Sequence, residues 1–229
     1  MTAIGSSGLD VFPFGLGGNT FGWTSDKDTS FAVLDAYVAG GGNFIDTADG
    51  YSAWVPGNVG GESETIIGEW TAARGNRDSV IVATKVFSHP QFRGLSPKNV
   101  LAAADASLAR LQTDRIDLYF VHRDDPDVPV AEAAGAFHEL LLAGKIRHVG
   151  LSNFTAPRLR EWFAVSAAEG FAAPVALVFH NPVWKTSRRV VDRLWINCPW
   201  ITRRRCRSSD LAQIIAQSLA ELKSVAAAG

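Results

Sequence analysis

The 229-residue chain has few cysteines, no long hydrophobic run and no surplus of charge of either sign. Its two cysteines, Cys198 and Cys206, are too few for a disulfide framework or a four-ligand zinc site. No stretch approaches the roughly 18 consecutive apolar residues of a membrane-spanning helix, and residues 1–10 lack the basic and apolar regions of a signal peptide. These absences predict a cytoplasmic protein with no membrane partner.

The charge balance and the apolar content are those of an ordinary globular protein. The formal net charge is −1, and 47% of the residues are hydrophobic. Because binding to nucleic acid requires a basic surface, we expect no nucleic-acid partner. The apolar content is enough for one large hydrophobic core.

Strand-like and helix-like segments alternate along most of the chain. Short apolar runs rich in β-branched residues predict strands, and apolar residues at helical spacing predict helices between them. This regular alternation is typical of parallel β/α architecture. After a short strand and turn within 9–23, the predicted strands lie at 44–46, 80–85, 116–122, 149–152 and 175–179, and the predicted helices lie at 27–39, 63–73, 97–111, 130–143 and from 156 onward.

Two parallel architectures compete, and a glycine-rich turn helps to separate them. The turn Gly15-Leu16-Gly17-Gly18 lacks the Gly-x-Gly-x-x-Gly spacing of a dinucleotide-binding sheet, because Thr20 stands where the third glycine would be. Polar residues instead follow the ends of several different strands, which favours a (β/α)8 barrel of the TIM type.

Asp46, Lys85 and His122 each end a different predicted strand, and Tyr51 follows Asp46 by five residues. Taken singly, Asp46 and Lys85 could form a structural ion pair, and His122 could be a core histidine. Together on one barrel rim they have the chemistry needed to protonate a carbonyl oxygen. A tyrosine has an unperturbed pKa of about 10, so it needs a nearby cation. Lys85 would lower the pKa of Tyr51, and Asp46 would hold Lys85 in position. His122 would hydrogen-bond the substrate oxygen or help to relay the proton.

Longer motifs around these residues resemble the aldo/keto reductase family over roughly residues 9–181. The resemblance implies an NADPH-dependent barrel enzyme that reduces an aldehyde or ketone to an alcohol, with Asp46, Tyr51, Lys85 and His122 as its catalytic tetrad. The matching segments are Phe44-Ile45-Asp46-Thr47-Ala48-x-x-Tyr51, Ala83-Thr84-Lys85, Asp117-Leu118-Tyr119-x-Val121-His122-Arg123-x-Asp125-Pro126 and Gly144-Lys145-Ile146-Arg147-x-Val149-Gly150-Leu151-Ser152-Asn153-Phe154.

The same resemblance implies a cofactor site. Ser152 and Asn153 would match the residues that hold the nicotinamide carboxamide. Gly18 and Asn19 would lie near the nicotinamide ribose, with Asp46 among the cofactor contacts.

Trp23 and Trp54, on the loops after the first two strands, are candidates for an apolar substrate pocket, and packing of the loops explains them equally well. We expect no metal site, because the carboxylates that follow His122 fit a solvated turn and most such sites need a second histidine.

The end of the chain departs from the family pattern. Val178 or a neighbour stands where the family has a glutamine, and no seventh strand is recognisable beyond it. We therefore divide the chain into a barrel-like portion, 1–182, and an atypical segment, 183–229, rich in arginine and tryptophan and ending in a predicted amphipathic helix. The expected fold is an incomplete barrel of about six βα units, because no seventh strand is recognisable and members of the family it resembles are longer than 229 residues.

Two functions remain open from the sequence. One is an NADPH-dependent reductase of a small-molecule carbonyl substrate. The other is a catalytically silent, family-derived protein or interaction subunit, because a truncated, deleted or frame-shifted final quarter would remove the adenosine-binding half of the site. The arginines at 203–205 fit either a remnant of 2′-phosphate recognition or an unstructured basic segment. The sequence does not predict the oligomeric state.

Overall fold

The centre of the molecule is a curved parallel sheet. The computed structural model describes residues 1–5 and 7–178. Within them six strands follow the order β3-β4-β5-β6-β7-β8, so neighbours in the sequence are neighbours in the sheet. The strands are β3 (Leu16–Gly17), β4 (Phe44–Asp46), β5 (Ile81–Val86), β6 (Ile116–Val121), β7 (Ile146–Ser152) and β8 (Ala176–Val178).

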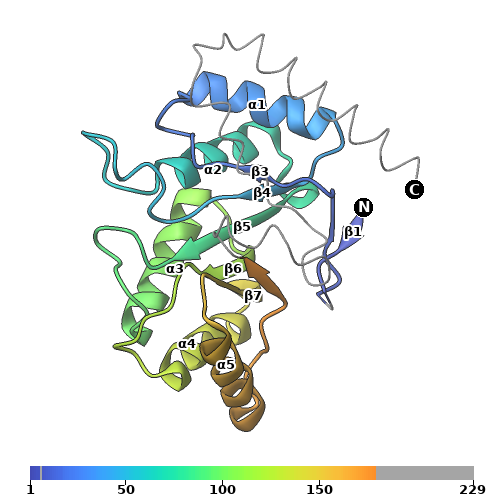
Figure 1. Ribbon diagram of the computed structural model, residues 1–229. Helices are drawn as coiled ribbons and strands as arrows, with labels where there is room; N and C mark the ends of the chain where they lie inside the picture. Colours follow the sequence, from blue (N-terminus) through green and yellow to red (C-terminus); the bar gives the residue numbers. More distant parts are fainter. Residues whose placement is uncertain (6, 179–229) are drawn as a thin grey trace.

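Helices connect successive strands and cover the outer side of the curved sheet (Figure 1). Each helix packs on the next along the chain. This is the arrangement of an incomplete (β/α)8 barrel, which confirms the predicted fold class. The helices are α1 (Lys27–Ala39), α2 (Glu62–Arg74), α3 (Pro97–Leu111), α4 (Val130–Leu142) and α5 (Ala156–Glu169), with a 3-10 turn, η1 (Arg77–Ser79), before β5.

Local signals explain where the helices begin and end. Asp26 caps α1, because its carboxylate accepts the backbone N–H of Thr29 at 2.8 Å. Pro97 stands in the first turn of α3, where its missing N–H costs nothing. Gly170 ends α5 with φ +69°, a conformation that glycine adopts without strain.

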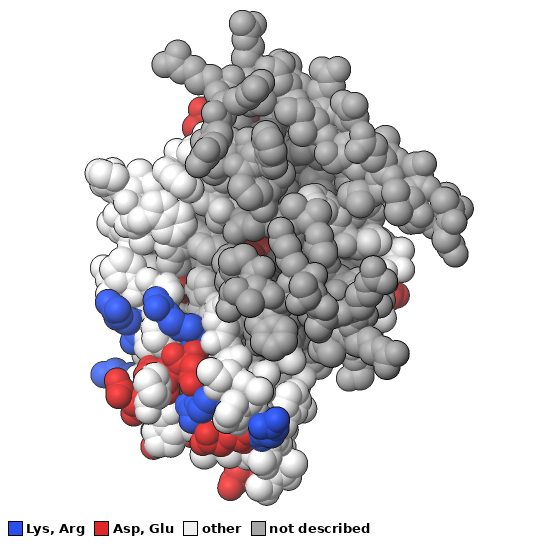
Figure 2. Space-filling model, viewed as in Figure 1, with Lys and Arg blue, Asp and Glu red and all other residues white. Residues whose placement is uncertain are grey.

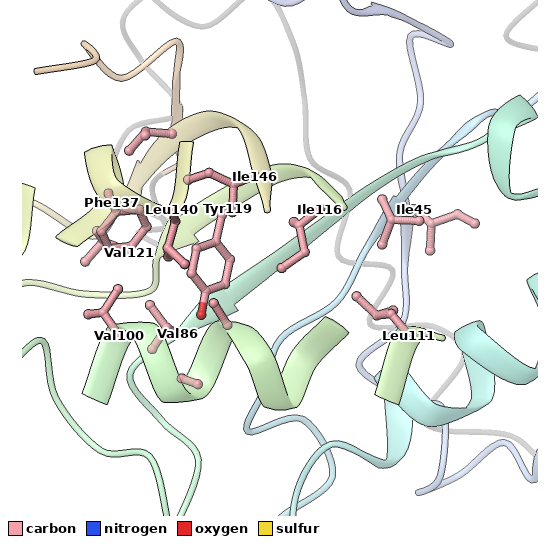
Figure 3. Close-up of a cluster of buried hydrophobic side chains, with 14 of the residues drawn as sticks. Ile45, Val86, Val100, Leu111, Ile116, Tyr119, Val121, Phe137, Leu140 and Ile146 are labelled. Atoms are coloured by element: carbon pink, nitrogen blue, oxygen red, sulfur yellow. The ribbon is translucent and has the colours of Figure 1, made fainter. Parts of the chain in front are cut away.

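Alternate residues of the strands build two apolar layers. Leu118 and Phe120 of β6 belong to an inner cluster that also contains Phe44 and Val178. The intervening residue Tyr119 points outward and packs among side chains from the helices. Figure 3 shows this outer layer, with Tyr119 directed from β6 toward the helix that carries Val100. The two layers hold the strand ends at fixed positions.

An antiparallel pair precedes the barrel and was not predicted. In it, β1 (Thr2–Ala3) pairs with β2 (Asp10–Val11). Val11 packs in the inner cluster, so the pair lies against one end of the barrel interior. Strands of two residues are too short to show a hydrophobic period in a sequence.

On the described part of the face in Figure 2, basic and acidic side chains lie interspersed. Among the described residues no helix is both long and apolar enough to cross a membrane. The predicted C-terminal helix, the arginines at 203–205 and both cysteines lie outside the described residues.

Candidate active site

A buried lysine lies at the centre of the site. Lys85, near the end of β5, is 2% exposed. Its Nζ donates to the two carboxylate oxygens of Asp46 at 2.6 and 2.7 Å and to the carbonyl oxygen of Thr47 at 2.7 Å. A third partner is the hydroxyl oxygen of Tyr51 at 3.0 Å. The ammonium therefore joins the end of β4 to the loop that carries the tyrosine.

The ion pair keeps this lysine charged despite its burial. Burial is the largest influence on the pKa of Lys85 and lowers it, but Asp46 and Tyr51 together raise it by more. The net pKa of Lys85 lies above its ordinary value. A fixed positive charge thus stands beside Tyr51 at neutral pH.

Tyr51 is a neutral phenol in this environment. Burial raises its pKa, the Lys85 charge lowers it, and the Asp46 charge raises it again, with a net increase above the ordinary value. Lys85 lowers the pKa of Tyr51 as predicted, but burial raises that pKa by more. The phenol is therefore protonated at neutral pH. The Lys85 ammonium lies beside it and can stabilise the tyrosinate that forms when the proton leaves.

Of these groups, Tyr51 lines a cavity of about 490 Å³. Tyr51 and His122 face it, with their ring centroids 6.1 Å apart. The backbone N–H of His122 donates to the carbonyl oxygen of Val86 at 3.0 Å, which fixes His122 beside the end of β5. Among the described residues, the cavity is lined by Asn19, Tyr51, Trp54, Ser88, His122, Arg123 and Asn153.

The predicted cofactor residues lie around the same rim. Asn19 and Asn153 line the cavity, and the side-chain amide of Asn153 donates to Ser152 Oγ and to the His122 carbonyl oxygen, each at 2.9 Å. Gly18 lies against the end of β4, where its N–H donates to the Asp46 carbonyl oxygen at 2.7 Å. A Cβ at Gly18 would lie 2.8 Å from Ser63 Oγ, so only glycine fits there.

The two tryptophans form one exposed aromatic pair. Trp23 and Trp54 are 44% and 53% exposed, and their rings meet edge to face with centroids 5.6 Å apart. Trp54 lines the cavity and also contacts Tyr51, at 6.2 Å between ring centroids. Trp23 does not itself line the cavity and packs against Trp54, which does.

The sequence reasoning missed three polar residues around the site. Ser88 lies with its Oγ 3.5 Å from His122 Nδ1, and Arg123 Nη2 is 3.5 Å from the same oxygen. Ser63 links the loops beneath the site, because it donates to the Gly18 carbonyl oxygen and accepts from Thr47. Arg123 follows His122 directly in a recognised motif, whereas nothing in the local sequence distinguishes Ser88 or Ser63.

Comparison with known proteins places the sequence of this chain in a family. The sequence model of the Aldo/keto reductase family matches residues 13–193. Norsolorinic acid reductase B of Aspergillus parasiticus is 35% identical over 208 residues, which cover 82% of this chain and 51% of that protein. Aryl-alcohol dehydrogenase (NADP(+)) of Phanerodontia chrysosporium is 33% identical over 210 residues, 81% of this chain and 51% of that protein.

A bacterial relative is also an aldo-keto reductase. Aldo-keto reductase YhdN of Bacillus subtilis is 36% identical over 184 residues, which cover 77% of this chain and 54% of that protein. The chain thus spans about half the length of the curated relatives it matches. Since the family match extends over most of its residues, the chain belongs to the aldo/keto reductase family.

Proposed function

We propose that the protein reduces the carbonyl group of an aldehyde or ketone to an alcohol with NADPH. The observation that carries the proposal is the 3.0 Å contact between the Tyr51 hydroxyl and the buried Lys85 ammonium at the edge of the cavity. A phenol beside a fixed cation can act as a general acid, because the cation already lies where it stabilises the tyrosinate that forms.

The proposed proton transfer follows from the hydrogen bonds. Tyr51 donates its proton to the carbonyl oxygen as that oxygen gains negative charge. The tyrosinate left behind is stabilised by Lys85, which Asp46 holds with two hydrogen bonds. Because the pKa of Tyr51 is raised, negative charge beside Lys85 develops only as the reaction proceeds. The attraction is therefore stronger in the transition state than in the ground state, which is the condition for catalysis.

The donors and acceptors at the rim suit a nicotinamide. The side-chain amides of Asn19 and Asn153 line the cavity that Tyr51 faces, and Ser152 lies hydrogen-bonded beneath Asn153. These groups would hold a carboxamide and a ribose hydroxyl. When bound, the reduced nicotinamide supplies a hydride to the carbonyl carbon. NADP(+) in the name of one relative supports the choice of NADPH over NADH.

The aromatic rim supports an apolar, planar substrate. The exposed ring of Trp54 contacts Tyr51 and is itself packed against Trp23, so an aromatic carbonyl compound would stack there while its oxygen reached the phenol. One relative is named for an aryl alcohol. Aromatic aldehydes are thus the substrates to test first.

A second candidate is a catalytically silent member of the family. The observation that favours it is the departure from the family pattern beyond residue 177, where the family's glutamine and a seventh strand are not recognisable in the sequence. A silent protein would show no saturable binding of NADPH.

The test is a pair of measurements on the full chain and on Tyr51→Phe. Titration with NADPH, followed by the fluorescence of the nicotinamide, should saturate for both proteins, because the phenol is not needed to hold the cofactor. Oxidation of NADPH in the presence of an aromatic aldehyde should occur with the unmodified chain and be lost in Tyr51→Phe. Turnover that survives in Tyr51→Phe would refute the assignment of the general acid.

A further inference from the structure

A second carboxylate lies beside the predicted tetrad and has no role in the proposed reaction. Asp49 is fully buried, between Asp46 and Tyr51 in the loop after β4. Among residues 1–5 and 7–178, no lysine or arginine forms an ion pair with it, and its Oδ1 has no hydrogen-bond partner. Burial, reinforced by the Glu64 charge, raises the pKa of Asp49 to about 7. Burying such a group is costly, so its contacts should explain why it is there.

Asp49 binds the neighbouring strand end with both its backbone and its side chain. Its N–H donates to the carbonyl oxygen of Lys85 at 3.0 Å. Its Oδ2 accepts the backbone N–H of Phe87 at 3.2 Å. One residue therefore holds the chain on both sides of Val86, directly after the lysine of the site.

The residue that follows Asp49 packs equally closely on the same segment. A Cβ at Gly50 would lie 2.8 Å from the carbonyl carbon of Ser88, so the two backbones touch. The loop that ends at Tyr51 thus lies on the end of β5 and on the segment beyond it.

The Phe87 N–H belongs to an unfavourable backbone bend. Phe87 has φ +144°, a value that residues with a side chain rarely adopt, and such conformations cost about 1–3 kcal/mol each. The bend carries the chain to Ser88, whose Oγ lies 3.5 Å from His122 Nδ1. The hydrogen bond from Phe87 to Asp49 holds this bend in place.

We propose that Asp49 is a positioning residue that clamps the Tyr51 loop onto the end of β5 and so sets the distance between the Tyr51 hydroxyl and the Lys85 ammonium. The acceptor oxygen works as a carboxylate, as a carboxylic acid or as an amide, so the clamp does not depend on the charge of Asp49. Its importance for catalysis rests on the proposed function. The clamp itself can be measured without turnover.

The structure offers a matched control at the opposite end of the barrel. Asp117 is also a buried carboxylate that accepts a backbone N–H from a neighbouring strand, that of Val82 at 2.9 Å, but unlike Asp49 it is ion-paired with Arg77. It lies near the start of β6, whereas the site lies at the strand ends. Loss of Asp117 should lower stability without affecting Tyr51.

The experiment observes Tyr51 directly by fluorine NMR. The chain has three tyrosines, so protein labelled with 3-fluorotyrosine gives three resonances, and Tyr51→Phe identifies the one to follow. Fluorine lowers the pKa of a phenol, which brings its titration into a range that folded proteins tolerate. The labelled full chain is compared with Asp49→Asn, Asp49→Ala and Asp117→Ala, and with Asp49→Leu, which fills the space if the alanine variant does not fold.

The clamp predicts a contrast among these variants. In Asp49→Ala and Asp49→Leu the Tyr51 midpoint should fall by about half a pH unit or more toward its ordinary value, because burial outweighs the Lys85 charge in the parent chain and a loosened loop lets water reach the phenol. In Asp49→Asn and Asp117→Ala it should stay at the value of the parent chain. An unchanged or raised midpoint in the alanine and leucine variants overturns the proposal, and so does an asparagine variant that shifts as far as alanine.

The kinetic arm separates this proposal from the proposed function. With an aromatic aldehyde, Asp49→Ala should lower kcat by about 10- to 100-fold with little change in KM, the effect of a misplaced catalytic group. Asp49→Asn should retain most of kcat. If the parent chain does not oxidise NADPH, the proposed function fails while the fluorine titration still decides the clamp.

Discussion

At the scale of single residues, the site depends on a buried ion pair. Lys85 and Asp46 have side chains only 3% and 9% exposed, so each charge relies on the other. Removing one partner of such a pair leaves an uncompensated charge in the interior. The cost should exceed the net stabilisation from the intact pair.

Replacing Lys85 tests this dependence. Lys85→Met should lower the free energy of unfolding by about 3–5 kcal/mol, measured by chemical denaturation, because Asp46 is left without its cation. The double variant Asp46→Leu with Lys85→Met should recover much of that loss and remain inactive. If the single variant is as stable as the parent chain, the ion pair is not buried as described.

The pKa of Asp49 gives a second prediction at this scale. Because it is raised from 3.8 to about 7, the folded state binds this proton more tightly than the unfolded state. The resulting stabilisation is complete below about pH 4 and is lost as the pH rises through about 7, up to about 4 kcal/mol in all. Glu64 and Arg110 face the same group, Glu64 raising its pKa and Arg110 lowering it.

Asp49→Asn removes this titration. Its stability should vary less between pH 5 and pH 8 than that of the parent chain, and it should be the more stable of the two at pH 8. Denaturation midpoints measured across that range provide the check. Parallel profiles for the two proteins would show that Asp49 does not titrate there.

The sequence predicted part of this residue-level arrangement. Asp46 and Lys85 stand at strand ends, and parallel strands bring their carboxyl ends to one rim, so their approach to Tyr51 could be anticipated. Their catalytic roles stay predictions. The burial of Asp49, the bend at Phe87 and the net rise of the Tyr51 pKa could not be anticipated, because each depends on how two loops pack.

At the scale of elements, two helical glycines show how closely the helices approach. A Cβ at Gly68 in α2 would lie 2.3 Å from the carbonyl oxygen of Arg110 in α3. At Gly135 in α4 the nearest atom, on the Phe171 ring, would be 3.6 Å away, an ordinary contact. The first glycine is needed for packing, and the second is not.

The pair makes a matched prediction. Gly68→Ala should destabilise the protein by about 2 kcal/mol or more, since the obstructing atoms are backbone. Gly135→Ala should stabilise it by up to about 1 kcal/mol, the difference in helix propensity. Thermal unfolding of the two variants tests both signs. Equal effects would mean that α2 and α3 are not in close contact.

The elements themselves were predicted with uneven success, for physical reasons. The bounds of α1 match because Asp26 caps its start and glycines follow its end. β7 begins at Ile146, earlier than predicted, since the polar Arg147 and His148 hide its first half from a search for apolar runs. The β1–β2 pair and η1 are too short to carry a periodic signal.

At the scale of the whole molecule, the described strands form a curled part of a barrel, and the chain spans about half the length of its relatives. Cofactor binding is the property in which the two candidate functions differ most. A ligand that binds only the folded state stabilises it by about 2.7 kcal/mol at 100 times its Kd.

NADPH should accordingly protect the protein against heat. For a chain of this size the melting temperature should rise by about 5–10 °C at that concentration, and Tyr51→Phe should gain as much as the parent chain. NADH at equal concentration should protect less. A melting temperature that does not respond to either cofactor supports the catalytically silent alternative.

The proposed function depends on one step, in which Tyr51, held beside Lys85, protonates a carbonyl group during reduction. The most direct test is the rate of NADPH oxidation with an aromatic aldehyde, measured for the parent chain and for Tyr51→Phe at NADPH concentrations that saturate both. We expect saturable turnover in the parent chain. In Tyr51→Phe the rate should fall by at least about a hundredfold, which is the contribution of a general acid. Equal rates in the two proteins, or no turnover in either, would contradict the proposed function.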